Sequence, residues 1–408
     1  MRIAFISLHT CPSALPGARD AGGMNVLLRE TAKELAARGA CVDIFSRRHD
    51  VNDPQIIELA PGARVIHLEA GPIDEPKRQL FQHLPAFQRE LELFARRENL
   101  RYDLVHGHYW LSGQAALSMR ERSGIPAIVS FHTLAKVQQL VVAGEPDAPQ
   151  RIEGEEAIVK ARPLIIASSD AERDELLRLY GADPKLTHVV TPGFDPALFH
   201  PIDRAQARAE LGFADSDKLI LFVGRMEPIK GLDVLLRAVA SMENRKGLRI
   251  VVIGGEPEDE AVQHMHGMAT ELDIQDHLDF AGAVPQERLP LYYSAADVSV
   301  APSFYETFGL VALESMACGT PVIAARVGGL QATIVDGQTG YLVPWHCPEP
   351  YAERLEVILG NPDLRRQFGQ AALASVTDFT WPRIVDRLQA VYAQALSLAT
   401  PELFLGCA

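Results

Sequence analysis

Long apolar runs are absent, although 47% of the 408 residues are hydrophobic. A helix that spans a bilayer needs about 20 consecutive apolar residues. Residues 1–6 are typical of a first β-strand rather than a signal peptide, because Leu8-His9-Thr10 interrupts the apolar run early. We therefore expect a cytoplasmic protein with no transmembrane segment, and peripheral contact with a membrane stays open.

Paired cysteines and a basic excess are also missing. The five cysteines show no paired spacing, which excludes a disulfide framework and a zinc motif: Cys11, Cys41, Cys318, Cys347 and Cys407. The formal net charge of −14 argues against nucleic acid as a partner. An anionic ligand would therefore need positive charge from a few basic residues placed near it.

Three common motifs of nucleotide and metal sites are missing as well. The sequence has neither a Walker A pattern nor a G-x-G-x-x-G that follows a predicted strand, which disfavours a P-loop ATPase and a Rossmann dehydrogenase. We identify no Asp-x-Asp pair placed to hold a metal ion. We expect a protein without a cofactor or a required metal.

Short apolar runs alternate with helical patterns along the whole chain. This alternation predicts an α/β fold with parallel sheets, and 408 residues suffice for two domains. Predicted strands lie at 3–8, 41–45, 102–106, 127–131, 164–167 and 187–190, and again at 219–223, 250–253, 278–281, 298–301, 322–325 and 340–343. The turn-rich segment 191–196 predicts a boundary between domains 1–195 and 196–380.

The segment 303–329 carries two carboxylates around a predicted helix start. Glu306 precedes the helix that begins at Gly309, and Glu314 lies more than one turn inside it, among apolar residues. A helix start after a strand is a ready anion site, and a buried carboxylate is costly unless it is bonded or faces a cleft. A long polar ligand with an anion in its middle, such as a nucleotide sugar, would fit. The simpler alternative is a capping Glu306 and a solvated Glu314.

Arg225 and Lys230 share a glycine-bounded loop after the predicted strand 219–223. A forked guanidinium and a compact ammonium together suit a pyrophosphate group. Two unrelated surface charges are the alternative interpretation.

Polar residues gather at the predicted strand ends of the first half. Ligands of open parallel sheets bind beyond the carboxyl ends of the strands. The candidates at such ends are His9, His108, Tyr109, His132 and Thr133. A further candidate is Gly22-Gly23, where a ligand can approach the backbone at a helix start.

These motifs, in this order along nearly the whole chain, resemble retaining glycosyltransferases of family 4, which have the GT-B fold. The resemblance implies two Rossmann-like domains that face each other across a cleft, with a C-terminal helix, 381–408, that crosses back to the N-terminal domain. It implies that the N-terminal domain binds the acceptor and the C-terminal domain binds a nucleotide sugar. Implied catalytic residues are His132, Glu306, Arg225 and Lys230. Implied donor-binding residues are Gly23, Arg225, Lys230, Val284, Glu306, Phe308, Gly309, Leu310, Val311 and Glu314.

The first half is most similar to the family members that transfer a sugar to inositol phosphate. The similarity rests on His9, residues 20–25, Lys77, the segment 108–113, residues 132–134 and Arg151. It implies that Lys77, Tyr109, Thr133 and Arg151 hold an acceptor phosphate. His9, Asp20, Gly22 and Asn25 complete the implied acceptor site. We expect transfer from UDP-N-acetylglucosamine or UDP-glucose to a phosphorylated polyol or sugar.

Four alternatives stay open. One is transfer to fructose 6-phosphate, as in sucrose-phosphate synthases, whose glycine loop usually has Gly-Gly-Gln where this chain has Gly-Gly-Met-Asn. Another is a GDP-mannose-dependent mannosyltransferase that acts on a lipid or glycan. A third alternative is a sugar-nucleotide epimerase, which would need acid and base groups around the sugar. The fourth is a protein that binds a nucleotide without turnover, which would not need all the charged residues of a transferase that this chain contains. A homodimer also stays open.

Overall fold

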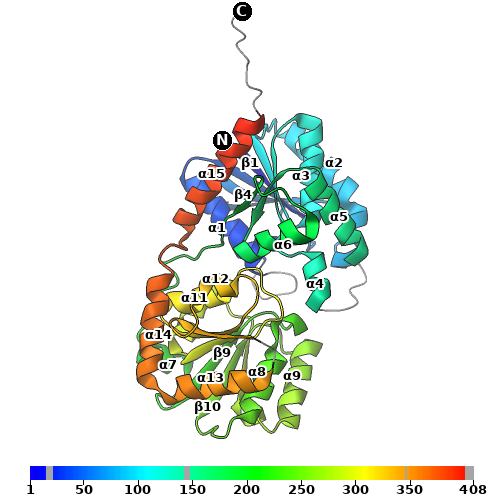
Figure 1. Ribbon diagram of the computed structural model, residues 1–408. Coiled ribbons are helices and arrows are strands. Elements are labelled where there is room, and N and C mark those ends of the chain that lie inside the picture. Colours follow the sequence, from blue (N-terminus) through cyan, green and yellow to red (C-terminus); the bar gives the residue numbers. More distant parts are fainter. Residues whose placement is uncertain (15–21, 142–147, 345–346, 400–408) are drawn as a thin grey trace, which may run out of the picture. The chain divides into compact units, whose positions relative to one another are not determined.

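The computed structural model describes residues 1–14, 22–141, 148–344 and 347–399. They form two compact α/β units, which are described separately below (Figure 1). The first unit comprises Met1–Ala14, Met24–Val190 and the segment from Pro382 onward. The second comprises Thr191–Trp381 together with Gly22 and Gly23.

The first unit is built on an eight-stranded sheet with the order β3-β4-β2-β1-β5-β6-β7-β8. Its strands are β1 (Arg2–Ser7), β2 (Cys41–Arg47), β3 (Ile56–Ala60), β4 (Ala63–Leu68), β5 (Leu104–His108), β6 (Ala127–Ser130), β7 (Leu164–Ala167) and β8 (Thr187–Val189). All neighbours pair in parallel except β3, which runs antiparallel to β4. The sequence analysis missed this edge hairpin.

Helices connect the parallel strands of the first unit. They are α1 (Gly23–Ala37), α2 (Leu84–Arg97), α3 (Trp110–Ser123), α4 (Ala135–Val141), α5 (Ala148–Lys160) and α6 (Asp170–Tyr180). Helix α6 illustrates how capping residues in the sequence determine where a helix begins and ends. The Ser169 side chain accepts the N–H of Glu172 at the start, and Gly181 takes a left-handed conformation with φ 67° at the end.

The C-terminal helix α15 (Trp381–Ala399) returns to the first unit, as predicted, and is red in Figure 1. The Tyr392 hydroxyl lies 2.9 Å from Nδ1 of the buried His106 on β5. Arg38 donates to the Asp386 carboxylate at 2.6 Å and to the Pro382 carbonyl at 2.7 Å. These contacts attach the end of the chain to the sheet that its beginning forms.

The second unit contains a six-stranded parallel sheet with the order β11-β10-β9-β12-β13-β14. Its strands are β9 (Lys218–Val223), β10 (Leu248–Ile253), β11 (Leu278–Gly282), β12 (Val298–Ala301), β13 (Val322–Ala325) and β14 (Gly340–Val343). Its helices are α7 (Arg204–Leu211), α8 (Leu232–Ser241), α9 (Glu260–Glu271), α10 (Leu289–Ala295), α11 (Leu310–Ala317), α12 (Leu330–Thr333), α13 (Pro348–Gly360) and α14 (Pro362–Ser375).

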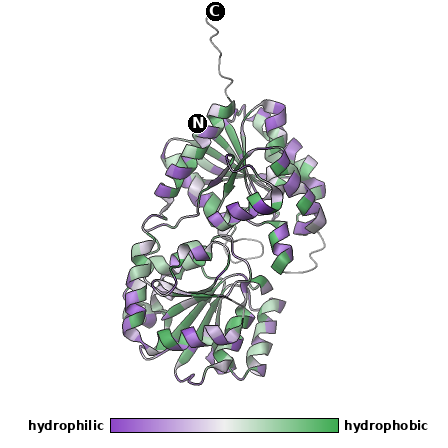
Figure 2. Cartoon of the chain, viewed as in Figure 1, coloured by the Kyte–Doolittle hydropathy of each residue, from purple (hydrophilic) through white to green (hydrophobic). Residues whose placement is uncertain are grey.

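Each sheet is the hydrophobic centre of its unit, as the green strands and the partly purple helices in Figure 2 show. On β9, Ile220 and Phe222 belong to one apolar cluster, whereas Leu221 belongs to the cluster on the opposite face. Successive residues of a strand point to opposite faces, so helices cover both sides of this sheet. No helix within the described ranges is both long and apolar enough to cross a membrane.

Candidate active site

In the second unit, the loop after β9 contacts the loop after β12 at the carboxyl edge of the sheet. The Phe304 N–H donates to the Ile229 carbonyl at 2.8 Å. Gly231 has φ 71°, and a Cβ there would lie 2.2 Å from the Pro302 carbonyl oxygen. Only glycine fits this close approach, which fixes the spacing between Lys230 and Glu306.

The closest charged contact between these loops is an ion pair. Lys230 Nζ lies 2.7 Å from Glu306 Oε2, and the two side chains are 23% and 16% exposed. Arg225 Nη1 pairs with Glu227 Oε1 at 2.5 Å in the same loop as Lys230. The three predicted residues Arg225, Lys230 and Glu306 therefore occupy one edge of the sheet, and solvent reaches each of them.

Three further glycines constrain the turn that carries Glu306. The Gly329 N–H donates to the Glu306 carbonyl at 3.0 Å. A Cβ on Gly328 would lie 1.8 Å from that same carbonyl oxygen. Gly309 has φ 92°, and a Cβ there would lie 2.5 Å from Leu330 Cδ2. The backbone from 306 to 309 is therefore held in one conformation that larger residues would disrupt.

The amino end of α11 lies directly after this turn. Gly309 is its N-cap and makes no side-chain capping hydrogen bond. The first N–H groups of a helix without such a cap are available to an anion. Leu310 and Val311 are partly exposed there, whereas Phe308 is buried. Val284 follows β11 and packs against the same apolar cluster as Leu310.

Glu314 is buried on α11 and accepts a hydrogen bond from the Tyr293 hydroxyl at 3.0 Å. Burial raises the pKa of Glu314 to about 7, and hydrogen bonds from Tyr293 and Gln286 oppose the shift. The simple alternative of a solvated Glu314 is thus wrong. The sequence analysis missed Tyr293, because its helix gives no signal that a hydroxyl faces α11.

In the first unit, the strand ends bring three predicted histidines together. His108 Nδ1 lies 3.0 Å from His132 Nε2, and their rings stack at 5.2 Å. The His9 ring lies 4.3 Å from the ring of Tyr109. Tyr109 and His132 both have positive φ, 79° and 64°. Such strained backbone positions cluster at functional sites.

Burial keeps these imidazoles neutral. It lowers the pKa of His132 to about 4 and that of His9 well below its ordinary value, with Lys77 adding to the effect on His9. The pKa of His108 is lowered by burial and then by His106 and His132. His9 Nδ1 and His108 Nε2 are buried without a hydrogen-bond partner among the described residues. Unpaired buried nitrogens of this kind are costly unless a ligand or water fills the site.

The four residues proposed for an acceptor phosphate are connected through Tyr109 and Arg151. Lys77 Nζ and the Arg151 guanidinium carbon each lie 5.0 Å from the centroid of Tyr109. Arg151 Nη2 donates to both the carbonyl and the hydroxyl of Thr133 at 2.8 Å. Lys77 is exposed, whereas Arg151 is buried. The structure thus gathers Lys77, Tyr109, Thr133 and Arg151 in one cluster.

Arg151 is held by more than Thr133. Its Nε donates to Glu155 Oε1 at 2.8 Å, one turn along α5, and its Nη1 donates to Gln138 Oε1 at 2.5 Å. The buried Glu155 carboxylate also accepts the Ala135 N–H at 3.0 Å. Sequence analysis missed Glu155, although the i, i+4 spacing of Arg151 and Glu155 on a helix was a usable signal.

The remaining acceptor candidates lie near the start of α1. Asn25 is fully buried, and its Nδ2 donates to Thr10 Oγ1 at 2.9 Å and to the Cys11 carbonyl at 2.5 Å. These contacts hold the segment that follows His9. Gly22 precedes α1 and Gly23 begins it. Asp20 lies outside the described residues.

Neither unit offers a set of metal ligands within residues 1–14, 22–141, 148–344 and 347–399. No group of three or more His, Cys, Asp or Glu residues in these ranges is arranged to hold a metal ion. His108 Nδ1 and His132 Nε2 contact each other, and the neighbouring His106 contacts Tyr392 and Ser130 through its two nitrogens.

Two family models match the chain, one for each half. Residues 21–198 match Glycosyltransferase Family 4, and residues 203–374 match Glycosyl transferases group 1. The first match covers most of the first unit and ends eight residues past Val190, where the chain passes into the second unit, and the second match lies within the second unit.

Curated relatives match along almost the whole chain. D-inositol 3-phosphate glycosyltransferase 2 of Catenulispora acidiphila is 42% identical over 97% of this chain and 95% of its own length. D-inositol 3-phosphate glycosyltransferase of Actinosynnema mirum is also 42% identical, over 99% of both chains.

A solved structure gives the same result for the fold. Sucrose-phosphate synthase from Thermosynechococcus elongatus superposes with a TM-score of 0.90 and 35% sequence identity, over 97% of this chain and 99% of that one. With two parallel-sheet units, matches in both halves and relatives above 40% identity, the chain belongs to glycosyltransferase family 4 and has the GT-B fold.

Proposed function

We propose that this glycosyltransferase moves a sugar from UDP-N-acetylglucosamine or UDP-glucose to a phosphorylated polyol such as inositol phosphate, with retention at the anomeric carbon. The observation that carries the proposal is the cluster of Lys77, Tyr109, Thr133 and Arg151. The names of the relatives that are 42% identical support the same acceptor.

The acceptor phosphate would bind beside Lys77. In a chain of net charge −14, two cations lie 5.0 Å from one aromatic ring, and because Arg151 pairs with Glu155, the positive charge left for a ligand is that of Lys77. The Thr133 hydroxyl accepts from Arg151, so its own proton remains free to donate to a phosphate oxygen. Arg151 is buried and bonded to the protein, and it holds Thr133 in position.

The donor diphosphate would bind at the loops after β9 and β12. Lys230 and Glu306 pair at 2.7 Å, which keeps both charges ordered before a ligand arrives. A phosphate oxygen that takes the place of Glu306 on Lys230 frees that carboxylate for the hydroxyls of the transferred sugar. The amino end of α11 adds backbone donors for the phosphates, and Glu314 would accept from the ribose hydroxyls.

The reaction would proceed on one face of the sugar. The bond from the anomeric carbon to the phosphate oxygen breaks, the acceptor oxygen attacks that carbon from the same side, and the leaving phosphate takes the acceptor proton. Arg225 and Lys230 stabilise the charge of the departing diphosphate. His132, which is neutral because burial lowers its pKa to about 4, would lie against the sugar. We propose that no metal ion is required.

A second candidate is transfer to fructose 6-phosphate. It is favoured by the 0.90 TM-score and 35% identity with a sucrose-phosphate synthase. Both candidates use a phosphorylated acceptor, so the cluster at Tyr109 supports them equally. A GDP-mannose donor with a lipid or glycan acceptor is the third candidate to test.

The test pairs each donor with each acceptor. Purified protein is incubated with UDP-N-acetylglucosamine, UDP-glucose or GDP-mannose, with inositol 3-phosphate, fructose 6-phosphate or unphosphorylated inositol. Acceptor-dependent release of nucleoside diphosphate, product mass and the anomeric coupling constant in the product are measured. We expect release with a UDP-sugar and inositol 3-phosphate, and an α-linked product.

Two exposed neighbours provide a matched pair of variants. Lys77→Ala should raise the KM for the phosphorylated acceptor roughly tenfold or more, since a hydrogen bond to a charged group is lost. Arg78→Ala, an exposed cation next to it, should leave that KM unchanged. Equal turnover of inositol and inositol 3-phosphate would show that the phosphate is not recognised and would reject the proposed acceptor class.

A further inference from the structure

A cavity within the second unit is lined by arginines. It has a volume of about 460 Å³, and its cationic wall is formed by Arg204, Arg365 and Arg366. Asp297 lies immediately before β12, and Gly319 to Pro321 lie immediately before β13. The cavity therefore lies at the amino ends of these strands. Glu306 and Arg225 follow the carboxyl ends, so the cavity is separate from the candidate donor site.

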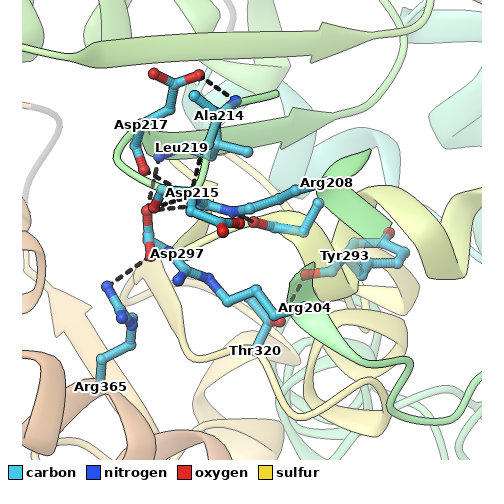
Figure 3. A network of polar contacts seen from close by, with 11 residues as sticks. Arg204, Arg208, Ala214, Asp215, Asp217, Leu219, Tyr293, Asp297, Thr320 and Arg365 are labelled. Carbon is cyan, nitrogen blue, oxygen red and sulfur yellow. Dashed lines mark hydrogen bonds and ion pairs between the residues drawn. The ribbon is translucent and has the colours of Figure 1, made fainter. Parts of the chain in front are cut away.

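One carboxylate faces three guanidinium groups in this cavity (Figure 3). Asp297 Oδ1 pairs with Arg365 Nη1 at 2.5 Å and also with Arg204, and its Oδ2 accepts from Arg208 Nη2 at 3.0 Å. The fourth contact of the carboxylate is the Leu219 N–H at 2.8 Å. Three positive charges against one negative charge leave an excess of two.

Arg208 has a purely internal role. Its side chain is fully buried, and it donates to the carbonyls of Ala214, Asp215 and Asp217 as well as to Asp297. The excess charge that a ligand can reach is therefore on the other two arginines. Arg204 is 38% exposed and Arg365 is 21% exposed.

Arg204 and Arg365 have N–H donors that the ion pairs with Asp297 do not engage. Arg204 Nε is buried and has no hydrogen-bond partner among the described residues. Each guanidinium carries five N–H donors, and the ion pair with Asp297 engages one nitrogen of each side chain. Burial lowers the pKa of Arg365 and the Asp297 carboxylate opposes this shift, while the charges of Arg204 and Arg366 lower the pKa further because like charges repel. An anion between them would relieve this repulsion and fill the open donors.

We propose that this cavity binds a phosphate dianion, as inorganic phosphate or as a small phosphate monoester. Arginine forks match phosphate oxygens in pairs, and a monoester carries a charge of about −1.5 to −2 at pH 7, close to the local excess. The cavity is large enough for an organic body as well, because small-molecule sites span about 300–1,000 Å³. Its apolar wall includes Pro201, Ile202 and Leu373.

The test is a ³¹P NMR titration of the whole protein with inorganic phosphate and with phenyl phosphate, in a Lys77→Ala background that weakens the proposed acceptor site and with saturating UDP to fill the donor site. Arg204→Gln and Arg365→Gln should each weaken phosphate binding roughly tenfold or more. The matched control is Arg249→Gln. Arg249 is 40% exposed, pairs with Asp279 at 2.7 Å and lies outside the cavity.

A second type of variant covers the case in which an arginine variant does not fold. Leu373 is exposed on the cavity wall, so Leu373→Glu adds a carboxylate without removing any buried contact with Asp297. It should abolish the binding. Tighter binding of phenyl phosphate than of inorganic phosphate would identify an ester as the ligand, and equal binding would identify the free ion. Unchanged affinity in Leu373→Glu and in the folded arginine variants would overturn the proposal.

Discussion

Glu314 provides a test of the donor site that depends on its burial. Burial raises its pKa from 4.5 to about 7. The folded state therefore holds this proton at pH values where the unfolded state has lost it. At one pKa unit per 1.36 kcal/mol, the shift of about 2.5 units corresponds to about 3 kcal/mol. This stability is present below pH 4.5 and is lost as pH rises through 7.

Replacement by glutamine removes this titration but keeps an acceptor for the Tyr293 hydroxyl. Glu314→Gln should gain stability relative to wild type as pH rises, by about 2 kcal/mol between pH 5.5 and pH 8. The assay is denaturant unfolding of both proteins at both pH values, because all other titrating groups cancel in the difference. Parallel stability curves would refute the raised pKa.

The same variant tests contact with ribose. If the Glu314 carboxylate accepts from the ribose hydroxyls, UDP binding should favour its charged form and release about half a proton at pH 7, where the group is half titrated. Calorimetry in two buffers of different ionisation enthalpy measures this release. Glu314→Gln should lack it and should bind UDP more weakly. Equal proton release in both proteins would assign the protons to another group.

Two further predictions concern one residue in each unit. Lys230→Ala should lower kcat roughly 10²–10³-fold, because a charge that stabilises the leaving diphosphate is removed. The rate of UDP release measures kcat, and a normal kcat in this variant would contradict the role of Lys230. Addition of EDTA should leave the wild-type rate unchanged. Tyr392→Phe should lower the free energy of unfolding by about 1–2 kcal/mol, since His106 Nδ1 loses its buried partner at 2.9 Å, with turnover unchanged. Unchanged unfolding of Tyr392→Phe would mean that water replaces the hydroxyl.

Most of the fold could be predicted because parallel strands are short apolar runs with clear ends. Every predicted strand lies within two residues of an observed one. The β3–β4 hairpin was missed since its strands contain Glu58, Arg64 and His67 among the apolar residues. The edge strand β3 can expose a residue such as Glu58, whereas on β4 Arg64 pairs with Asp43 and His67 contacts the Pro54 carbonyl. Neither strand therefore has the continuous apolar pattern of the central strands.

The sequence predicted which residues form the candidate site better than it predicted which residues they contact. Strand-end positions were enough to place His108 near His132. The partners of Glu314 and Lys230 were not predictable, because they connect residues 21 and 76 positions apart. The three arginines on Asp297 come from α7 and α14, and no local pattern relates those helices to the start of β12.

The return of α15 to the first unit has a consequence for synthesis of the protein. The chain leaves that unit after Val190 and re-enters it at Pro382. Ribosomes add about 5–20 residues per second, so roughly 10–40 seconds separate these two points. During this interval the second unit is being synthesised, whereas the surface beside His106 that Tyr392 later covers is open. The nascent first unit is therefore the part of the chain that most needs protection from aggregation, even though its sequence leaves the ribosome first.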